Sequence, residues 1–208
     1  ITNIMDFLKY FAKPLTSLLI LFTIVGCATQ NVSNKITREN LAASNKALLV
    51  FSITQPLSSE KFGNSLFRFY RNGNSIYAET HDVTGITPNP KSEFANFYGR
   101  VGVIEVPAGE HQIAAAFKTG NGIFQVRGKV EKNTVTVKSG EIVYVGALNV
   151  KLEFGTFFLG LADVKGVAAD LNDERVRDLP IFKAKYPLLG EPEIRLFRVG
   201  PIVGESAN

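Results

Sequence analysis

The hydrophobic residues of this chain fall into short segments, and turns containing glycine, proline or asparagine separate them about every ten positions. Residues 47–53 form an apolar run with the length of a buried strand. Between residues 148 and 154 every second residue is apolar, which is the period of a strand with one buried face. Short segments of this kind predict a β-sandwich or a β-barrel rather than a helical domain.

Two turn sequences predict hairpins. Asn72-Gly73-Asn74 separates two segments of strand composition, residues 65–71 and 75–79, and Asn-Gly favours a tight hairpin because it tolerates positive φ. A second turn, Gly120-Asn121-Gly122, follows a segment at residues 111–119. We therefore expect an all-β fold, mainly an antiparallel β-sandwich of about seven to nine strands, with a short C-terminal helical segment.

The helical segment is expected where the chain changes character. Residues 170–186 are highly charged and, apart from Pro180, contain no residue that breaks a helix. Asn172 or Asp173 is placed to cap a first short helix. Asp178 is placed to cap a second one, with Pro180 in its first turn, where proline is tolerated.

The beginning of the chain has the pattern of a secretory signal. Lys9 and Lys13 precede an apolar run at residues 15–25. This run has 11 residues, whereas a membrane-spanning helix needs about 20. The only cysteine of the chain follows directly, and the sequence Ile24-Val25-Gly26-Cys27 resembles the lipobox of bacterial lipoproteins. An ordinary cysteine buried in a core strand would leave the order of basic and apolar residues unexplained.

The lipobox resemblance implies a location and an anchor. In that family the signal peptide, here residues 1–26, is cut off, and both the cysteine thiol and the new N-terminus are acylated, for example with palmitate. Cys27 would then hold the protein in the membrane without a second membrane element. Ala28 stands where aspartate retains lipoproteins of enteric-type Gram-negative bacteria at the inner membrane. The resemblance thus implies the outer membrane, and leaves open the periplasmic or the surface face.

These signals divide the chain into four parts, of which the signal peptide is the first. Residues 27–46 are mostly polar and lack a period, so we expect a lipidated tether with a mean reach of about 25 Å. Residues 47–161 are the expected β-sandwich domain, in which a turn at residues 155–156 leads into a short strand at 157–161. Residues 162–208 are expected to be the helical segment, a last strand and a tail, packed on the sandwich.

Composition narrows the class of protein. The net charge is +4 and no run of five like charges occurs, whereas a nucleic-acid partner needs a concentrated basic face. We therefore expect no nucleic-acid partner. The export signal implies a compartment in which disulfides are stable, but the chain has a single cysteine. Its hydrophobic core alone must hold the domain together.

Two segments resemble a recurrent pattern of bacterial envelope proteins. These are VPAGEHQIAAAF, residues 106–117, and SGEIVYVGAL, residues 139–148. They resemble small prealbumin-like or PEGA-like β-sandwich domains of envelope lipoproteins, in which a Pro-x-Gly-x-His turn joins two strands. The resemblance implies that Pro107 and Gly109 shape the turn and that Tyr144 fills the core. It covers about residues 47–155 and implies a fold rather than an activity.

Candidate functional residues outside the lipobox are few. A long loop at residues 81–99 carries Phe94, Phe97 and Tyr98. These aromatics either pin the loop on the sheet or form an exposed patch for a partner. We expect the first arrangement, because closely spaced aromatics pack more often than they protrude.

The polar residues predict no active site. His81 and His111 would have to converge with carboxylates to bind a metal, and His111 begins a strand after a turn, where a solvated or turn-stabilising histidine is common. We assign no catalytic residue, metal or cofactor. Four acidic residues are better explained by helix capping and surface solvation. They are Asp170, Asp173, Glu174 and Asp178.

The expected function is a non-enzymatic binding or scaffolding role in the bacterial envelope. The partners would be membrane lipid, through acylated Cys27, and an envelope protein. Two alternatives stay open: an envelope hydrolase that acts on cell wall or glycan through carboxylates, and a subunit of a secretion or transport assembly. Carboxylates about 5–10 Å apart in a cleft would favour the hydrolase, and a flat aromatic patch would favour a partner.

Overall fold

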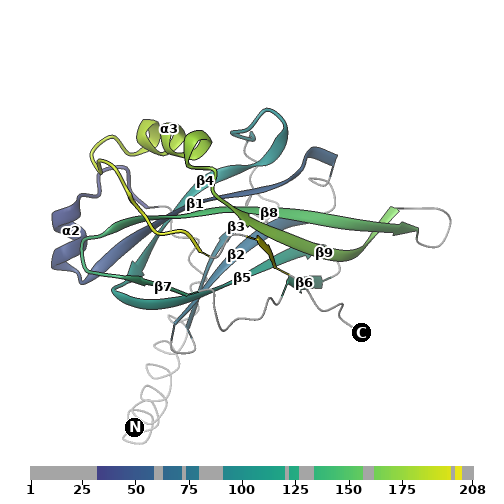
Figure 1. The fold of residues 1–208 in the computed structure, drawn as a ribbon, viewed down its shortest axis with the longest axis horizontal. Coiled ribbons are helices and arrows are strands. Elements are labelled where there is room, and N and C mark those ends of the chain that lie inside the picture. Colours follow the sequence, from purple (N-terminus) through teal and green to yellow (C-terminus); the bar gives the residue numbers. More distant parts are fainter. Residues whose placement is uncertain are drawn as a thin grey trace, which may run out of the picture.

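The computed structural model describes residues 32–58, 63–71, 74–79, 91–119, 122–126, 134–156, 162–197 and 200–202, which form a strand-rich domain (Figure 1). The expectation of a mostly-β protein is confirmed. The helices are α2 (Arg38–Ala43) and α3 (Arg175–Lys185). The strands are β1 (Lys46–Pro56), β2 (Gly63–Arg71), β3 (Asn74–Glu79), β4 (Phe97–Pro107), β5 (Gly109–Thr119), β6 (Gly122–Val126), β7 (Thr134–Val137), β8 (Ile142–Thr156), β9 (Ala162–Asn172), β10 (Glu193–Ile194) and β11 (Gly200–Ile202).

The strands form two sheets. The first, which we call the mixed sheet, has the order β11-β9-β8-β1-β4, and β10 also pairs with β8. The second, the antiparallel sheet, has the order β3-β2-β5-β6, and β7 also pairs with β5. In the mixed sheet β1 and β10 each run parallel to β8. We had expected mainly antiparallel strands, so these parallel pairs are a difference from the sequence prediction. Parallel neighbours need a long connection, and the chain between β1 and β8 supplies it by building β2 to β7.

Strand β1 lies inside the mixed sheet, between β8 and the edge strand β4, and is buried on both faces. Its odd-numbered apolar residues, such as Phe51, belong to the cluster between the two sheets, which we call the inner cluster. Leu48 and Val50 belong to a second group on the opposite face, the outer cluster. A strand covered on both faces reads as a continuous apolar run, which explains the composition of residues 47–53.

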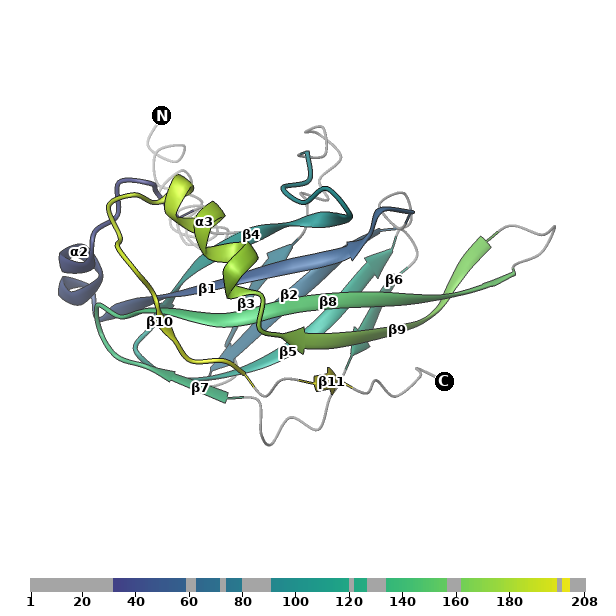
Figure 2. The ribbon, with the colours of Figure 1, turned by 45° about the horizontal axis from the view of Figure 1, so that its top comes forward.

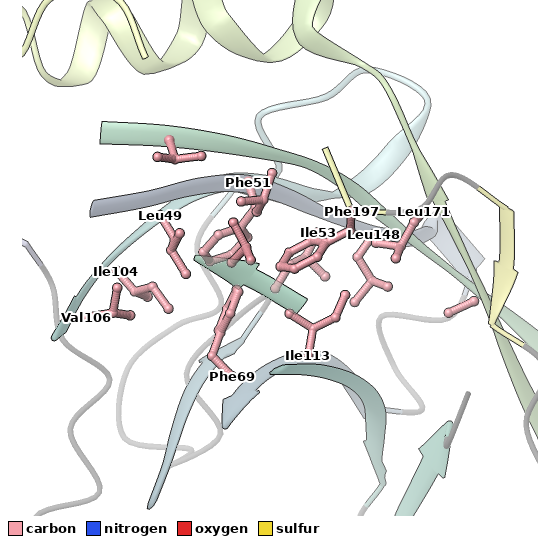
Figure 3. Close-up of a cluster of buried hydrophobic side chains, with 14 of the residues drawn as sticks. Leu49, Phe51, Ile53, Phe69, Ile104, Val106, Ile113, Leu148, Leu171 and Phe197 are labelled. Carbon is pink, nitrogen blue, oxygen red and sulfur yellow. The ribbon is translucent and has the colours of Figure 1, made fainter. Parts of the chain in front are cut away.

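The inner cluster joins the two sheets (Figure 3). Phe51 of the mixed sheet and Phe69 of β2 lie with their ring centroids 5.3 Å apart. Ile113 of β5 is also buried in this cluster, with 2% of its surface exposed. Side chains of both sheets therefore share one core.

A β-bulge in β8 changes which residues face the inner cluster. The register passes from Val50 opposite Tyr144 to Phe51 opposite Gly146, so Val145 is an extra residue. Gly146 has a φ of 111°, a conformation that favours glycine. Before the bulge Val143 and Val145 face the inner cluster, and after it Leu148 and Val150 do so. One extra residue shifts by one position the alternation of side chains between the two faces of the sheet. Tyr144, which precedes the bulge, therefore lies on the outer face, whereas the even-numbered Leu148 and Val150 face the inner cluster.

The outer face of the mixed sheet is covered by both helices (Figure 2). The buried Phe182 of α3 and Leu41 of α2 lie in the outer cluster, and Val32 and Ile36 pack against it. A capping box begins α2, in which Thr37 and Asn40 bond to each other's backbone N–H. Residues 27–46 were expected to be a tether, but the described part of this segment, from Val32 onward, packs on the domain.

The C-terminal part differs from the expectation. β8 continues through the turn predicted at residues 155–156, and β9, which the sequence did not predict, pairs with it as far as Thr156 opposite Ala162. A single helix, α3, replaces the two that we expected. Asp178 lies inside this helix and is completely buried, so neither capping nor surface solvation explains it. The strand predicted at residues 157–161 lies outside the described residues.

Candidate functional site

The predicted site residues fall into two groups. The lipobox residues Ile24, Val25, Gly26 and Cys27 lie outside the described residues. The three aromatics predicted on the loop are described, and they do not form a common exposed patch. Phe94 lies in the loop, whereas Phe97 and Tyr98 belong to β4, which begins earlier than expected. Phe94 is 8% exposed and Tyr98 is 3% exposed, whereas Phe97 is 44% exposed. The structure therefore fits the pinned loop at two of the three positions.

Side-chain contacts hold the loop in front of β4. The guanidinium carbon of Arg177 lies 4.4 Å from the centre of the Phe94 ring, a cation–π contact with α3. The Ser92 hydroxyl donates to the carbonyl of Phe97 at 2.6 Å and accepts from the N–H of Gly99 at 3.1 Å. These contacts fix the loop between α3 and the sheet.

The same loop protects an exposed edge of the mixed sheet. β4 is the last strand on its side, and such an edge carries unpaired backbone groups. The N–H of Val101 donates to Glu93 Oε2 at 2.8 Å, and its carbonyl accepts from Lys185 Nζ at 2.9 Å. Glu93 and Lys185 also form an ion pair. Both edge groups of Val101 are thereby satisfied, which hinders strand addition at this point.

A largely buried polar cluster lies between α3 and the mixed sheet, and we call it the Asp178 network. Asp178 Oδ2 accepts a hydrogen bond from Ser52 Oγ at 2.6 Å and another from the Tyr144 hydroxyl at 2.7 Å. Its Oδ1 accepts from Arg177 Nε at 2.8 Å. Arg177 Nη2 donates to Ser52 Oγ at 2.8 Å. Ser52 and Asp178 have no exposed surface.

Both hydroxyl protons of this network have an acceptor, which favours a structural role. The hydroxyls of Ser52 and Tyr144 donate to the carboxylate, and Ser52 Oγ in turn accepts from Arg177. Burial, followed by the nearby charge of Asp178, raises the pKa of Tyr144 far above its usual range, and the phenol keeps its proton. Among the described residues, the side chains bonded to the Ser52 hydroxyl are Asp178 and Arg177, and neither is an imidazole of the kind that activates a serine. The arrangement docks α3 on the sheet.

A second ion cluster attaches the β10 segment to the turn before β8. Arg195 Nη1 lies 3.0 Å from Glu141 Oε2, and Arg195 Nη2 lies 2.6 Å from Glu193 Oε2. The hydrogen bond from Arg195 lowers the pKa of Glu141, and the two carboxylates raise the pKa of Arg195. Because these side chains are partly exposed, water screens the pairs and limits their contribution.

His111 stabilises the turn before β5 and is not solvated. It is 1% exposed, and its Nε2 lies 2.7 Å from the carbonyl of Pro107. Burial lowers the pKa of His111, which favours the neutral imidazole. Gly109 has a φ of 129°, and a Cβ there would lie 2.7 Å from Arg71 Nη2, so this position requires glycine.

The described part of the chain contains no group of three or more histidine, cysteine or acidic side chains that could bind a metal ion. Within the same residues, neither helix has the length and hydrophobicity to cross a membrane.

Comparisons with known proteins add little to this geometry. No family model and no curated protein matches the sequence. Among solved structures, the chain is similar to a leucine-rich repeat protein from Bacteroides thetaiotaomicron, with 11% sequence identity and a TM-score of 0.32. The match covers 61% of this chain and 21% of that protein, so the chain spans about a fifth of the neighbour's length. A similarity at this level supports no conclusion about function.

The loop aromatics can be tested by a pair of substitutions. Phe94→Ala is expected to lower the free energy of unfolding by about 2–4 kcal/mol, because it removes a buried ring and its contact with Arg177. Phe97→Ala, the matched control at the beginning of β4, should change it by less than about 1 kcal/mol, because that residue is 44% exposed. Urea unfolding of both variants measures the difference. Equal midpoints would show that Phe94 does not pin the loop.

Proposed function

We propose that this chain is a lipid-anchored protein of the outer membrane of a Gram-negative bacterium, with a non-enzymatic role in binding or scaffolding. One observation carries the proposal: two lysines, an apolar run and Ile24-Val25-Gly26 precede the only cysteine, Cys27. Acyl chains at this cysteine would bury enough methylene groups to hold the protein, since each contributes about 0.8 kcal/mol. The β-rich domain would then be displayed at the membrane.

The contacts of the described residues favour a structural use of the polar groups. Asp178 is the only acidic residue among them that is buried, and it accepts hydrogen bonds from three side chains. A general acid or base has to exchange its proton with substrate or water, which a fully engaged and buried carboxylate does poorly. We therefore propose a binding or scaffolding domain rather than a hydrolase built on this residue.

We also propose that the two packed sheets are a variant of the antiparallel β-sandwich. The inner cluster between them and the antiparallel hairpins of both sheets support this assignment. The parallel neighbours β1 and β8 would be a modification of that plan. The turn at Gly109, which has a positive φ, is of the kind that the PEGA-like resemblance implies.

The mature N-terminus tests the proposed anchor. We expect the chain isolated from bacterial membranes to begin at Cys27 and to carry acyl chains on its sulfur and on its N-terminal nitrogen. Mass spectrometry of the N-terminal peptide measures both features. A mature chain that begins at another residue, or an unmodified Cys27, would refute the proposal.

A further inference from the structure

We propose that one end of the domain lies directly on the lipid surface, an inference that rests on the proposed acylation of Cys27. This end, which we call the α2 end, consists of residues 32–43 with helix α2, the turn at residues 138–141 and the loop at residues 186–192. It would contact anionic headgroups through basic side chains and place Leu188 at the boundary with the acyl chains. The occupant of this surface is thus a membrane, not a second protein.

The length of chain between the anchor and the domain supports this arrangement. Val32 already packs against the outer cluster, and five residue steps separate it from Cys27. Fully extended, these steps span at most about 18 Å. By contrast, β8 has 15 residues and is about 50 Å long. The anchor therefore reaches only the part of the domain near Val32 and cannot bring the far end of β8 to the bilayer.

Hydrogen bonds make the α2 end one continuous surface. Arg38 of α2 donates from Nε to the carbonyl of Leu189 at 3.2 Å and from Nη2 to the carbonyl of Glu191 at 2.9 Å. Ser139 Oγ donates to the carbonyl of Ala42 at 3.0 Å. In Figures 1 and 2 this end of the molecule lies opposite the projecting ends of β8 and β9. The helix, the turn and the loop thus occupy the same end.

The charges of the α2 end suit an anionic surface. Within the described part of the chain, ion pairs engage the carboxylates of Glu141 and Glu191, with Arg195 and Lys183. By contrast, three cations of this end are in no ion pair with a described residue; Glu39 is likewise in none, and Lys138 also lies in the field of Glu141. These cations are Lys35, Arg38 and Lys138. Anionic lipids attract such basic groups when they lie close to the membrane surface.

Leu188 supplies the apolar part of the contact. It lies in the loop after α3 and is 64% exposed. An exposed leucine in a loop that Arg38 contacts fits the interface between headgroups and acyl chains, where peripheral helices and loops bury such residues. The neighbouring Leu189 is 2% exposed and packs in the outer cluster, so the loop that presents Leu188 is held in place.

An environment-sensitive fluorophore can test the contact on the full chain. We expect a label on Leu188→Cys to shift its emission to shorter wavelength in vesicles of phosphatidylethanolamine and phosphatidylglycerol. A quencher carried on the lipid chains should also quench it several-fold more than the control. The acylated Cys27 does not compete for a thiol label. Val176→Cys is the matched control, because Val176 is 89% exposed at the beginning of α3.

The outcomes separate this inference from the anchor itself. If the labelled chain floats with the vesicles and the two labels respond equally, the α2 end does not lie on the bilayer and the inference is wrong. If the chain does not float with the vesicles, the anchor proposal fails, and this inference fails with it. The double variant Lys35→Gln, Lys138→Gln should still float, while the response of the Leu188 label decreases. An undiminished response would show that these lysines do not contact the headgroups.

Discussion

Replacing Asp178 with alanine is expected to lower the free energy of unfolding by about 3–5 kcal/mol. The carboxylate accepts hydrogen bonds from Ser52, Tyr144 and Arg177, and it has no exposed surface. Its loss would leave two hydroxyls and a guanidinium without their acceptor in a buried place. Urea unfolding of the purified chain in a mild detergent, followed by circular dichroism, measures the effect.

Asp173→Ala is the matched control for this experiment. Asp173 lies just before α3 and pairs with Arg175 at the surface, where both side chains remain partly exposed. Water screens such a pair, so its loss should cost less than about 1 kcal/mol. Comparable losses of stability in the two variants would contradict a special role for the buried carboxylate. Tyr144→Phe, which removes one donor and keeps the carboxylate, should have an effect of about 1 kcal/mol.

Local signals predicted several strands, because they depend on residues close in the sequence. Asn72-Gly73-Asn74 indicated a hairpin, and the register places Arg71 opposite Asn74 at its closed end. The apolar run at residues 47–53 became β1, whose ends extend to Lys46 and Pro56. Turn chemistry and strand length act locally and can be read from the sequence.

Pairing between distant strands could not be predicted in the same way. The parallel neighbours β1 and β8 are brought together by the long path of the chain through both sheets. β9 carries few large apolar residues and is a strand because it pairs with β8 along its whole length. The tertiary partner, and not the intrinsic preference of the segment, decides such cases.

The Asp178 network had a signal that we interpreted wrongly. Asp178 and Phe182 lie four residues apart, so they share one face of α3. An acidic residue in line with a buried aromatic is expected to need hydrogen-bond donors from the surface it faces. The donors, Ser52 and Tyr144, come from β1 and β8, which the fold brings side by side, and the β-bulge at Gly146 sets which residues of β8 face α3. That part was not readable from the sequence.

The segment after the cysteine shows how packing overrides composition. Residues 27–46 are mostly polar, which favoured a tether. Leu41, however, lies in the outer cluster with no exposed surface, and Arg38 bonds to the loop after α3. A short helix is marginal alone but is stable when a few such contacts hold it. The distance between a lipid anchor and the domain therefore becomes much shorter than the sequence indicated.

Replacing Cys27 with serine is expected to abolish acylation completely, because the sulfur is the acyl acceptor in the family whose lipobox this segment resembles. The uncut precursor should then remain held by its signal, residues 1–26. Mass spectrometry of the intact chain distinguishes the two forms, since the precursor keeps the signal and lacks the acyl chains. Ala28→Ser, a small change at the residue that follows Cys27, is the control and should leave cleavage and acylation unchanged. If the Cys27→Ser chain is still cut before residue 27 and recovered with acyl chains, Cys27 is not the anchor.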